Sequence, residues 1–373
     1  MKIVIDDKIP YIKGALEPFA EVVYLPGSKT TPAEVKDADA LITRTRTLCD
    51  ERLLAGSSVK FIATATIGYD HIDTSYCEKA GISWTNAPGC NARSVEQYIA
   101  AALFTWAGKK SVRLKDKTIG IVGVGNVGSK VARFCEILGM KVLLNDPPRE
   151  RKEGSRLFVP LGTILKEADI ITLHVPLNLT GEDATHHLVD QTFLSGLKSD
   201  VLLINSCRGE VTDTQAVINS IKTNTLSGFI ADCWENEPDI SMELMDLSDL
   251  ATPHIAGYSK DGKANGTMMS IRAISRFFNL GIDNWQPEGV ELPANTVIDP
   301  DGWKQDEESV IAGAVLHTYP IEKDDRALRQ NPALFEKLRG DYPVRREFTS
   351  YYVKAGKLTV ATAEKLKQIG FNI

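Results

Sequence analysis

The sequence predicts an α/β protein with two lobes, each a doubly wound parallel sheet covered by helices, and a smaller α+β segment at the C-terminus. Three observations support this fold class. Short apolar runs alternate with helical patterns from Met1 to about Ala92, and a second series of the same kind begins at Thr118. From about Trp285 the pattern changes to a proline-containing linker, followed by a segment rich in both charge signs.

The first lobe is predicted to contain five short strands with helical stretches such as Pro32–Lys36 between them. This alternation indicates βαβ units and therefore a parallel sheet. A long helix with apolar residues at helical spacing is expected to follow, from Ser94 to about Trp106. The expected strands are Lys2–Ile5, Ala20–Tyr24, Ala40–Ile42, Phe61–Ala63 and Ser83–Trp84.

The second lobe opens with the glycine pattern of a dinucleotide site. Gly123, Gly125 and Gly128 form G-x-G-x-x-G between an expected strand, Thr118–Val122, and an expected helix that begins at Gly128. In this Rossmann-like arrangement the first glycine permits the tight turn, the second permits close approach of the pyrophosphate, and the third permits close helix–strand packing. The pyrophosphate is expected at the helix N-terminus, where free N–H groups favour an anion.

Asp146 selects the kind of dinucleotide. It ends the next apolar run, Lys141–Asn145, eighteen residues after Gly128. A carboxylate at this place accepts hydrogen bonds from ribose hydroxyls and repels a 2′-phosphate. We therefore predict NAD rather than NADP as the cofactor.

The remaining pattern predicts the domain boundaries. We expect a helix over about Lys263–Phe278 to cross back to the first lobe. The prediction is a substrate-binding lobe of residues 1–93 plus about 258–285, an NAD-binding lobe of residues 94–257, a cleft between the two lobes, and a C-terminal segment of residues 286–373. The later strands of the NAD-binding lobe are expected at Ile170–Leu173, Val201–Ile204, Gly228–Ala231 and Leu250–Thr252.

Three charged residues follow strands of the second lobe: Arg208, Glu237 and His254. Ligands of open parallel sheets bind at the carboxyl ends of the strands, so all three are expected on the edge that meets a nicotinamide. Oxidation of a 2-hydroxy acid needs a base for the hydroxyl proton, and an imidazole suits that task. Glu237 would favour the imidazolium form, and Arg208 would bind the substrate carboxylate and polarise the C2 oxygen.

The composition narrows the class of partner. The net charge of −6 does not favour binding to nucleic acid, which is itself negatively charged. No run of residues is long and apolar enough for a membrane span. The six cysteines are scattered and the six histidines show no metal-ligand spacing. We therefore expect a cytoplasmic protein with reduced thiols and without a metal.

The loop Arg44-Thr45-Arg46 follows an expected strand of the first lobe. Two arginines that flank a hydroxyl suit a phosphate, through charge-assisted hydrogen bonds. The alternative is a solvated pair on an exposed loop.

Several motifs, taken in order, resemble the D-isomer-specific 2-hydroxyacid dehydrogenase family. Besides the glycine pattern they are Gly68–Asp73, Asn86–Ser94, Asn205–Gly209, Asp232 with Glu237-Pro238, and Thr252–Gly257. The resemblance covers residues 1 to about 285 and implies Arg208, Glu237 and His254 as the catalytic set. The cofactor-binding residues that follow from the pattern and the resemblance are Gly123, Gly125, Asn126, Val127, Gly128, Asp146, Val175, Pro176, Ser206, Cys207, Arg208, Asp232 and Gly257.

The chain is most similar to one branch of that family, which acts on a phosphorylated hydroxy acid. The residues Phe335–Phe348 resemble the C-terminal dimerisation domain of that branch, which implies a homodimer. The resemblance also places the substrate near Thr45, Thr66 and Tyr258. Two residues depart from the pattern: Thr45 stands where serine is more frequent, and Val175 where threonine is frequent.

Other interpretations stay open at this point. The same chemistry on another acid, such as 3-phosphoglycerate or an unphosphorylated hydroxy acid, is one, and an NAD(H)-sensing corepressor or scaffold without turnover is another. His71 and His174 are interpreted as structural or cofactor-lining. The pair Arg345-Arg346 is either a surface pair or reaches the active site of a partner subunit.

Overall fold

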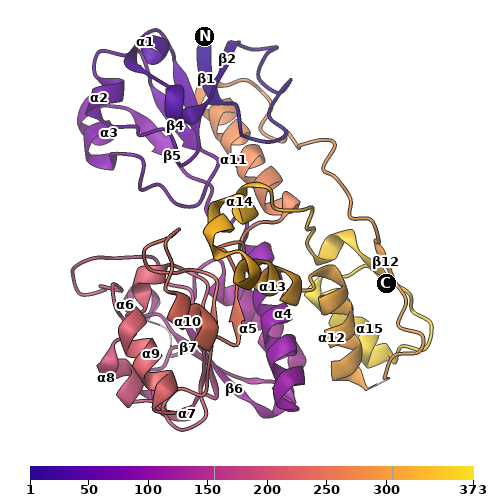
Figure 1. The fold of residues 1–373 in the computed structure, drawn as a ribbon. Coiled ribbons are helices and arrows are strands. Elements are labelled where there is room, and N and C mark those ends of the chain that lie inside the picture. The colour runs from indigo at the N-terminus through magenta and orange to yellow at the C-terminus, as the bar shows by residue number, and fades with distance from the viewer. Residues whose placement is uncertain (155, 305) are drawn as a thin grey trace. The chain divides into compact units, whose positions relative to one another are not determined.

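The computed structural model describes residues 1–154, 156–304 and 306–373. They form two compact units, each assembled from two stretches of the chain (Figure 1). The first unit comprises Met1–Asn91 and Ser259–Glu291, and the second comprises Ala92–Tyr258 and Leu292–Ile373.

The first unit is built on a five-stranded sheet in the order β2-β1-β3-β4-β5. All its strand pairs are parallel, so each strand returns through a crossover, and the order 2-1-3-4-5 is that of a doubly wound sheet. The strands are β1 (Lys2–Asp6), β2 (Glu21–Leu25), β3 (Ala40–Thr43), β4 (Phe61–Thr64) and β5 (Ser83–Thr85).

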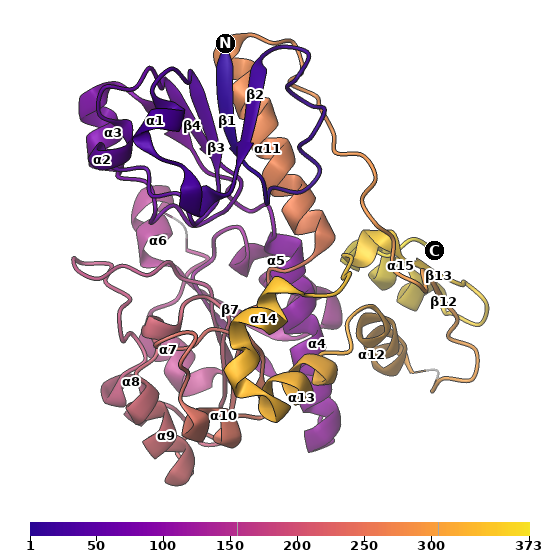
Figure 2. The same cartoon turned by 45° about the horizontal axis from the view of Figure 1, so that its top comes forward.

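The longest helix of this unit, α11 (Lys260–Phe278), comes from the second stretch of the chain and lies beside the sheet (Figure 2). Its Ile271 and Ile274 share a core with Ile3 and Ile5 of β1. The helix begins three residues before the predicted start because the Ser259 side chain caps it, accepting from the Gly262 N–H at 2.8 Å. The shorter helices of the unit are α1 (Pro32–Val35), α2 (Glu51–Leu54) and α3 (Thr74–Ala80).

The second unit contains a six-stranded sheet in the order β11-β10-β9-β8-β6-β7, again wholly parallel. After β6 the chain continues to β7 on one side and then to β8 on the other. The carboxyl ends of β6 and β8 therefore flank the switch point, where doubly wound sheets bind ligands. The strands are β6 (Thr118–Val122), β7 (Lys141–Asn145), β8 (Ile170–Leu173), β9 (Leu202–Asn205), β10 (Gly228–Ala231) and β11 (Leu250–Ala251).

Helices cover both faces of this sheet, which explains why its strands are continuously apolar. One core joins α4 and α5 to Ile121 and Ile204, and another joins the helices of the opposite face to Leu203 and Phe229. The helices are α4 (Ala92–Lys110), α5 (Gly128–Leu138), α6 (Pro147–Glu153), α7 (Leu161–Glu167), α8 (Gln191–Ser195), α9 (Thr214–Lys222) and α10 (Met242–Leu247).

The C-terminal segment is built onto the second unit. Its helices α12 and α15 lie beside α4 and α5, and Ile311, Val315 and Leu366 belong to the same core as Ile99 and Leu103 of α4 (Figures 1 and 2). The segment therefore shares its core with the six-stranded sheet. Its elements are α12 (Glu307–Thr318), α13 (Glu322–Gln330), α14 (Phe335–Gly340), α15 (Val360–Ile369) and the paired strands β12 (Val297–Ile298) and β13 (Tyr352–Val353).

The α/β fold class and the two doubly wound sheets are confirmed. Among the described residues, no helix combines the length and the hydrophobicity that a membrane span requires. The helix α4 extends four residues beyond its predicted end, through Lys109 and Lys110, because cations in the last turn favour a helix even after the apolar pattern stops.

One buried carboxyl of α4 makes the stability of the fold depend on pH. Glu96 is 7% exposed, and burial raises the pKa of its carboxyl from 4.5 to about 7, although Arg93 and Lys130 act in the opposite direction. Because the folded-state pKa is the higher one, the wild-type protein loses stability as the pH rises from about 4.5 to 7.

We therefore predict that Glu96→Gln stabilises the protein at pH 8 relative to wild type, by up to about 3 kcal/mol, and has little effect at pH 4.5. Urea unfolding of both proteins across this range measures the difference. A difference that does not grow with pH contradicts the assignment.

Candidate active site

The glycine loop after β6 forms an open cradle. Gly123 has a φ of +87°, and a Cβ added to it would stand 2.7 Å from the His174 carbonyl. A Cβ at Gly128 would stand 2.0 Å from the Gly123 carbonyl oxygen, so only glycine permits this approach of α5 to the loop. By contrast, a Cβ at Gly125 meets no heavy atom of the described residues within 4 Å, which leaves the space that a pyrophosphate needs. Asn126 and Val127 complete the turn into the N-terminus of α5.

Asp146 lies at the end of β7 and is bound to the same loop. Its carboxylate accepts from the Val124 N–H at 2.8 Å and from the Arg149 N–H at 3.1 Å. The first bond ties the acidic residue to the glycine turn, and the second caps α6. A carboxylate has further lone pairs, so this arrangement keeps acceptor capacity for ribose hydroxyls.

The loops after β8 and β9 lie across the switch point from the glycine turn. Val175 and Pro176 follow β8, and Val175 is close enough to touch a Cβ placed on Gly123. Ser206 and Cys207 follow β9, and the buried Ser206 hydroxyl has no hydrogen-bond partner among the described residues. A bound dinucleotide could supply the missing hydrogen bond to this hydroxyl, which follows a strand of the same sheet as the glycine turn. The predicted cofactor residues thus fit NAD.

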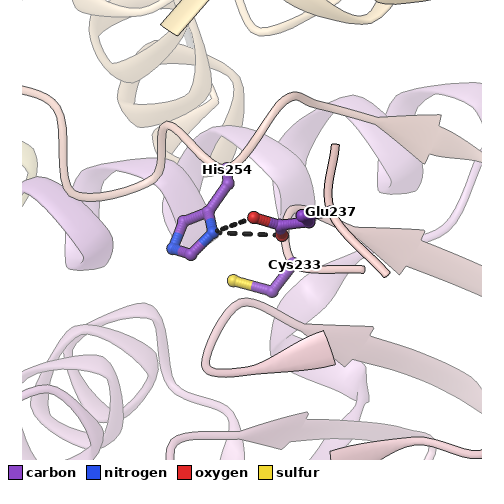
Figure 3. Close-up of side chains that lie close together, drawn as sticks. All are labelled: Cys233, Glu237 and His254. Atoms are coloured by element: carbon purple, nitrogen blue, oxygen red, sulfur yellow. Dashed lines mark hydrogen bonds and ion pairs between the residues drawn. The ribbon is translucent and has the colours of Figure 1, made fainter. Parts of the chain in front are cut away.

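His254 and Glu237 form a close pair (Figure 3). The Nδ1 atom of His254 lies 2.7 Å and 3.0 Å from the two carboxylate oxygens of Glu237. A carboxylate only accepts, so Nδ1 carries the proton, and in the neutral ring Nε2 keeps its lone pair. The pair therefore presents Nε2 as a base and stabilises the imidazolium that forms when this base takes a proton.

Cys233 stands beside this pair, and its sulfur, Glu237 and His254 offer three possible metal-ligand atoms within 4.8 Å of one another. The chemistry argues for another interpretation. Burial raises the pKa of the Cys233 thiol well above its ordinary value, whereas a metal binds the thiolate. His254 also already uses Nδ1 to bind Glu237. The cluster is better explained as a His–Glu pair beside a neutral buried thiol.

Arg208 follows β9, the neighbour of β10 in the sheet. Its Nη1 donates to the Cys207 carbonyl at 2.7 Å, and its own carbonyl accepts from Asn205 at 2.9 Å. Its charge lowers the pKa of Cys233, although burial dominates that thiol, so the guanidinium lies within electrostatic range of the Glu237 and His254 pair. A Cβ on Gly209 would stand 1.9 Å from the Trp234 backbone, which explains the glycine after Arg208.

Asp232 organises the loop that carries His254. It is 1% exposed, and its carboxylate accepts from the Thr252 hydroxyl at 2.7 Å and from the N–H groups of Ile255 and Ala256 at 2.8 and 2.9 Å. Its backbone carbonyl accepts from the His254 N–H at 2.8 Å. These bonds show that Asp232 holds residues 252–256 in place. Gly257 and Tyr258 follow directly on that loop.

Two residues near the pair were missed from the sequence. Trp234 donates its N–H to Glu237 at 2.9 Å and its indole N–H to the Thr252 carbonyl at 2.9 Å, so it fixes the carboxylate. The guanidinium of Arg339, on α14, lies 5.8 Å from the centre of the Tyr258 ring. The position of Trp234 beside Asp232 was a usable signal, whereas nothing in the sequence pattern linked Arg339 to Tyr258.

The other predicted substrate residues belong to the first unit. Arg44, Thr45 and Arg46 follow β3, and Thr66 follows its neighbour β4, so all lie at the same carboxyl edge of that sheet. Thr45 and Arg46 are exposed. Arg44 donates to the Lys8 carbonyl at 3.2 Å, and the Thr66 hydroxyl contacts the Gly68 carbonyl at 2.8 Å.

The residues whose roles were left open have buried surroundings. Burial lowers the pKa of His174 to about 3 and also lowers that of His71. Each ring lies 3.1 Å from a threonine hydroxyl, Thr172 and Thr64 respectively, as expected for structural histidines. Arg345 is only 4% exposed, so the interpretation as a surface pair is wrong for this residue.

Comparison with known proteins identifies the family of this chain. Residues 91–256 match the NAD binding domain of D-isomer specific 2-hydroxyacid dehydrogenases, and residues 293–370 match a domain of unknown function. The solved structure of D-lactate dehydrogenase from Aquifex aeolicus with NAD and lactic acid is 27% identical, with a TM-score of 0.61, and the match covers 76% of this chain and 97% of that one. The NAD⁺-bound 3-phosphoglycerate dehydrogenase of Entamoeba histolytica is also 27% identical, with a TM-score of 0.62 and coverage of 78% and 99%.

Full-length relatives are more similar. The erythronate-4-phosphate dehydrogenase of Bacteroides fragilis is 51% identical over 356 residues, which cover 95% of this chain and 99% of that protein. The corresponding enzyme of Porphyromonas gingivalis is 43% identical over 98% of both chains. The chain is therefore an NAD-dependent oxidoreductase that acts on a CH–OH group, and it belongs to the family of the erythronate-4-phosphate dehydrogenases.

Proposed function

We propose that the protein oxidises the C2 hydroxyl of 4-phospho-D-erythronate, giving 2-oxo-3-hydroxy-4-phosphobutanoate, in the biosynthesis of pyridoxine and pyridoxal 5′-phosphate. The names of the relatives support this substrate. The single structural observation that carries the chemistry is the His254–Glu237 pair, 2.7 Å apart, on the sheet edge that also holds the glycine cradle.

The reaction removes a hydride from C2 and a proton from the hydroxyl oxygen on the same carbon. NAD, when bound, supplies the hydride acceptor. His254 takes the hydroxyl proton at Nε2, while Glu237 holds the ring through Nδ1 and stabilises the positive charge that develops on it. Arg208 binds the substrate carboxylate in a planar fork and polarises the C2 oxygen as it becomes a carbonyl.

The cofactor is assigned to the edge of the second sheet. In this proposal Gly123, Gly125 and Gly128 accommodate the pyrophosphate, and Asp146 accepts from the ribose hydroxyls. The orphaned Ser206 hydroxyl, the open space at Gly125 and the bond from Asp146 to the glycine turn support this assignment. The proposed cofactor site is completed by the loop residues Val175, Pro176, Cys207 and Gly257.

The substrate phosphate is assigned to the first unit. Arg44 and Arg46, with the hydroxyls of Thr45 and Thr66, lie at the carboxyl edge of the five-stranded sheet, where doubly wound sheets bind ligands. Tyr258, on the loop after His254, is also assigned to the substrate site.

We further propose that the protein is a cytoplasmic homodimer that associates through residues 286–373. All six cysteines are free, which suits a reducing compartment. Among the described residues, six of the fourteen exposed large apolar side chains lie in this C-terminal stretch, which is nearly a quarter of the chain. That concentration supports an interface there.

His254→Ala is predicted to lower kcat about 10²- to 10⁴-fold, because it removes the general base. The affinity for NADH is expected to stay close to that of wild type, since the glycine cradle is untouched. Glu237→Gln, which keeps the shape but removes the charge, is expected to give a smaller loss of kcat. The assay follows NADH absorbance with 4-phospho-D-erythronate, and NADH binding is titrated by fluorescence.

His317→Ala serves as the control, because this exposed histidine lies on α12. Turnover by His254→Ala equal to that of wild type contradicts the mechanism. A panel with 3-phosphoglycerate and D-erythronate tests the substrate, and faster turnover of either acid refutes the proposed one. Tight NADH binding without turnover of any acid would favour a sensing role instead.

The dimer predicts a mass in solution of twice that of one chain at micromolar concentration. Light scattering after size exclusion measures it directly. Removal of the C-terminal segment is unsuitable as a test, because the segment shares its core with α4 and α5 and its loss would expose that core. A monomeric mass for the full chain refutes the proposal.

A further inference from the structure

The described mechanism does not use Arg345, a buried cation in the stretch between α14 and β13. It is 4% exposed, and its Nη2 donates to the carbonyls of Ile255 at 3.1 Å and Ala256 at 2.5 Å. These two residues follow His254 directly. A side chain of the C-terminal segment therefore binds the backbone of the loop that carries the base.

The Arg345 guanidinium lies among aromatic rings, with the carboxylates of Asp324 and Asp232 within electrostatic range. The guanidinium carbon lies 4.5 Å from the centre of the Tyr319 ring and 5.6 Å from that of Tyr342. Both tyrosines donate their hydroxyls to Asp324, at 2.8 and 2.7 Å, which fixes the rings around the cation. Among the described residues, Nε and Nη1 of Arg345 have no hydrogen-bond partner.

A buried guanidinium with two unpaired nitrogens is costly, so packing alone does not explain it. A methionine of similar length would fill the same aromatic cage without a desolvation penalty. Relative to methionine, the cation adds a charge-assisted hydrogen bond to each of two carbonyls and an electrostatic attraction to Asp324 and Asp232.

The opposite side of the same loop is held by an anion. Asp232 accepts from the N–H groups of Ile255 and Ala256, while Arg345 donates to the carbonyls of these two residues. The two residues are thus held between a buried negative and a buried positive charge, in the orientation that their backbone dipoles favour. His254 itself has a φ of +53°, a left-handed conformation that strains a non-glycine residue and persists only where neighbours hold it.

We propose that Arg345 is a positioning residue for the reaction: from the C-terminal segment it holds residues 254–258, and through them it sets the direction of His254 Nε2 and the place of Gly257 and Tyr258. The catalytic part of this inference rests on the proposed function. It gives the C-terminal segment a task within its own subunit, separate from dimerisation.

The experiment compares Arg345→Met, Arg345→Lys and the control Arg326→Met, which changes an exposed arginine on α13. Arg345→Met is expected to lower kcat roughly 10²-fold, because a displacement of about 1 Å at a catalytic group has an effect of that size. The KM for the acid is expected to change much less. Arg345→Lys should recover part of kcat, because an ammonium also donates to carbonyls, and guanidinium ions added to Arg345→Ala should restore activity.

A second measurement is independent of any substrate. Amide hydrogen exchange of Arg345→Met should be faster in the peptide that covers residues 252–258 and unchanged in β6 and α5, while Arg326→Met matches wild type throughout. Light scattering checks that the oligomeric state is unaltered.

Unchanged exchange of residues 252–258 in folded Arg345→Met overturns the inference, and so does an unchanged kcat. A loss of kcat that neither lysine nor guanidinium recovers also overturns it, because a general folding defect then explains the loss. If wild type fails to oxidise 4-phospho-D-erythronate, the proposed function fails, while the exchange measurement still decides whether Arg345 holds the loop.

Discussion

The buried carboxylate of Asp232 is the interaction on which the active site depends. It lies directly after β10 and binds the side chain of Thr252 and the backbone of Ile255 and Ala256, which follow β11. Burial raises the pKa of this carboxyl because it disfavours the charged form. The hydrogen bonds from Thr252, Ile255 and Ala256 act in the opposite direction and stabilise the carboxylate. The loop between its partners carries His254 at a positive φ. Without that anchor, the ring that meets Glu237 would have no fixed direction.

The rest of the site follows from the parallel sheet. Its adjacent strands β9, β10 and β11 end at one edge, so the loops after them bring Arg208, Glu237 and His254 to the same edge. The glycine turn after β6 lies at the switch point of that same edge. The order of strands in this one sheet therefore places both the glycine turn and His254 at its carboxyl edge. In the proposed mechanism three side chains carry out the reaction, and Arg345 of the C-terminal segment binds the loop that carries one of them.

Local patterns in the sequence were sufficient for much of this account. Alternating apolar runs predicted both sheets, because parallel strands are buried on both faces, and the glycine spacing predicted a turn whose geometry excludes side chains at Gly123 and Gly128. The start of α11 was missed because it depends on the Ser259 cap rather than on periodicity. The contact of Arg345 with Ile255 joins residues ninety positions apart, and the shared core of α4 and α12 is equally non-local. No period or spacing carries such information, so the buried role of Arg345 emerged only from the structure.

In the proposed mechanism, Glu237 holds the proton of His254 on Nδ1 and thereby leaves Nε2 as the base. Nitrogen-15 NMR of protein labelled only at its histidines measures this directly, with His254→Ala to assign the resonance. We expect His254 to carry its proton on Nδ1 when neutral, with a downfield proton signal that moves in Glu237→Gln. A neutral His254 protonated on Nε2, or a signal unaffected by Glu237→Gln, would contradict it.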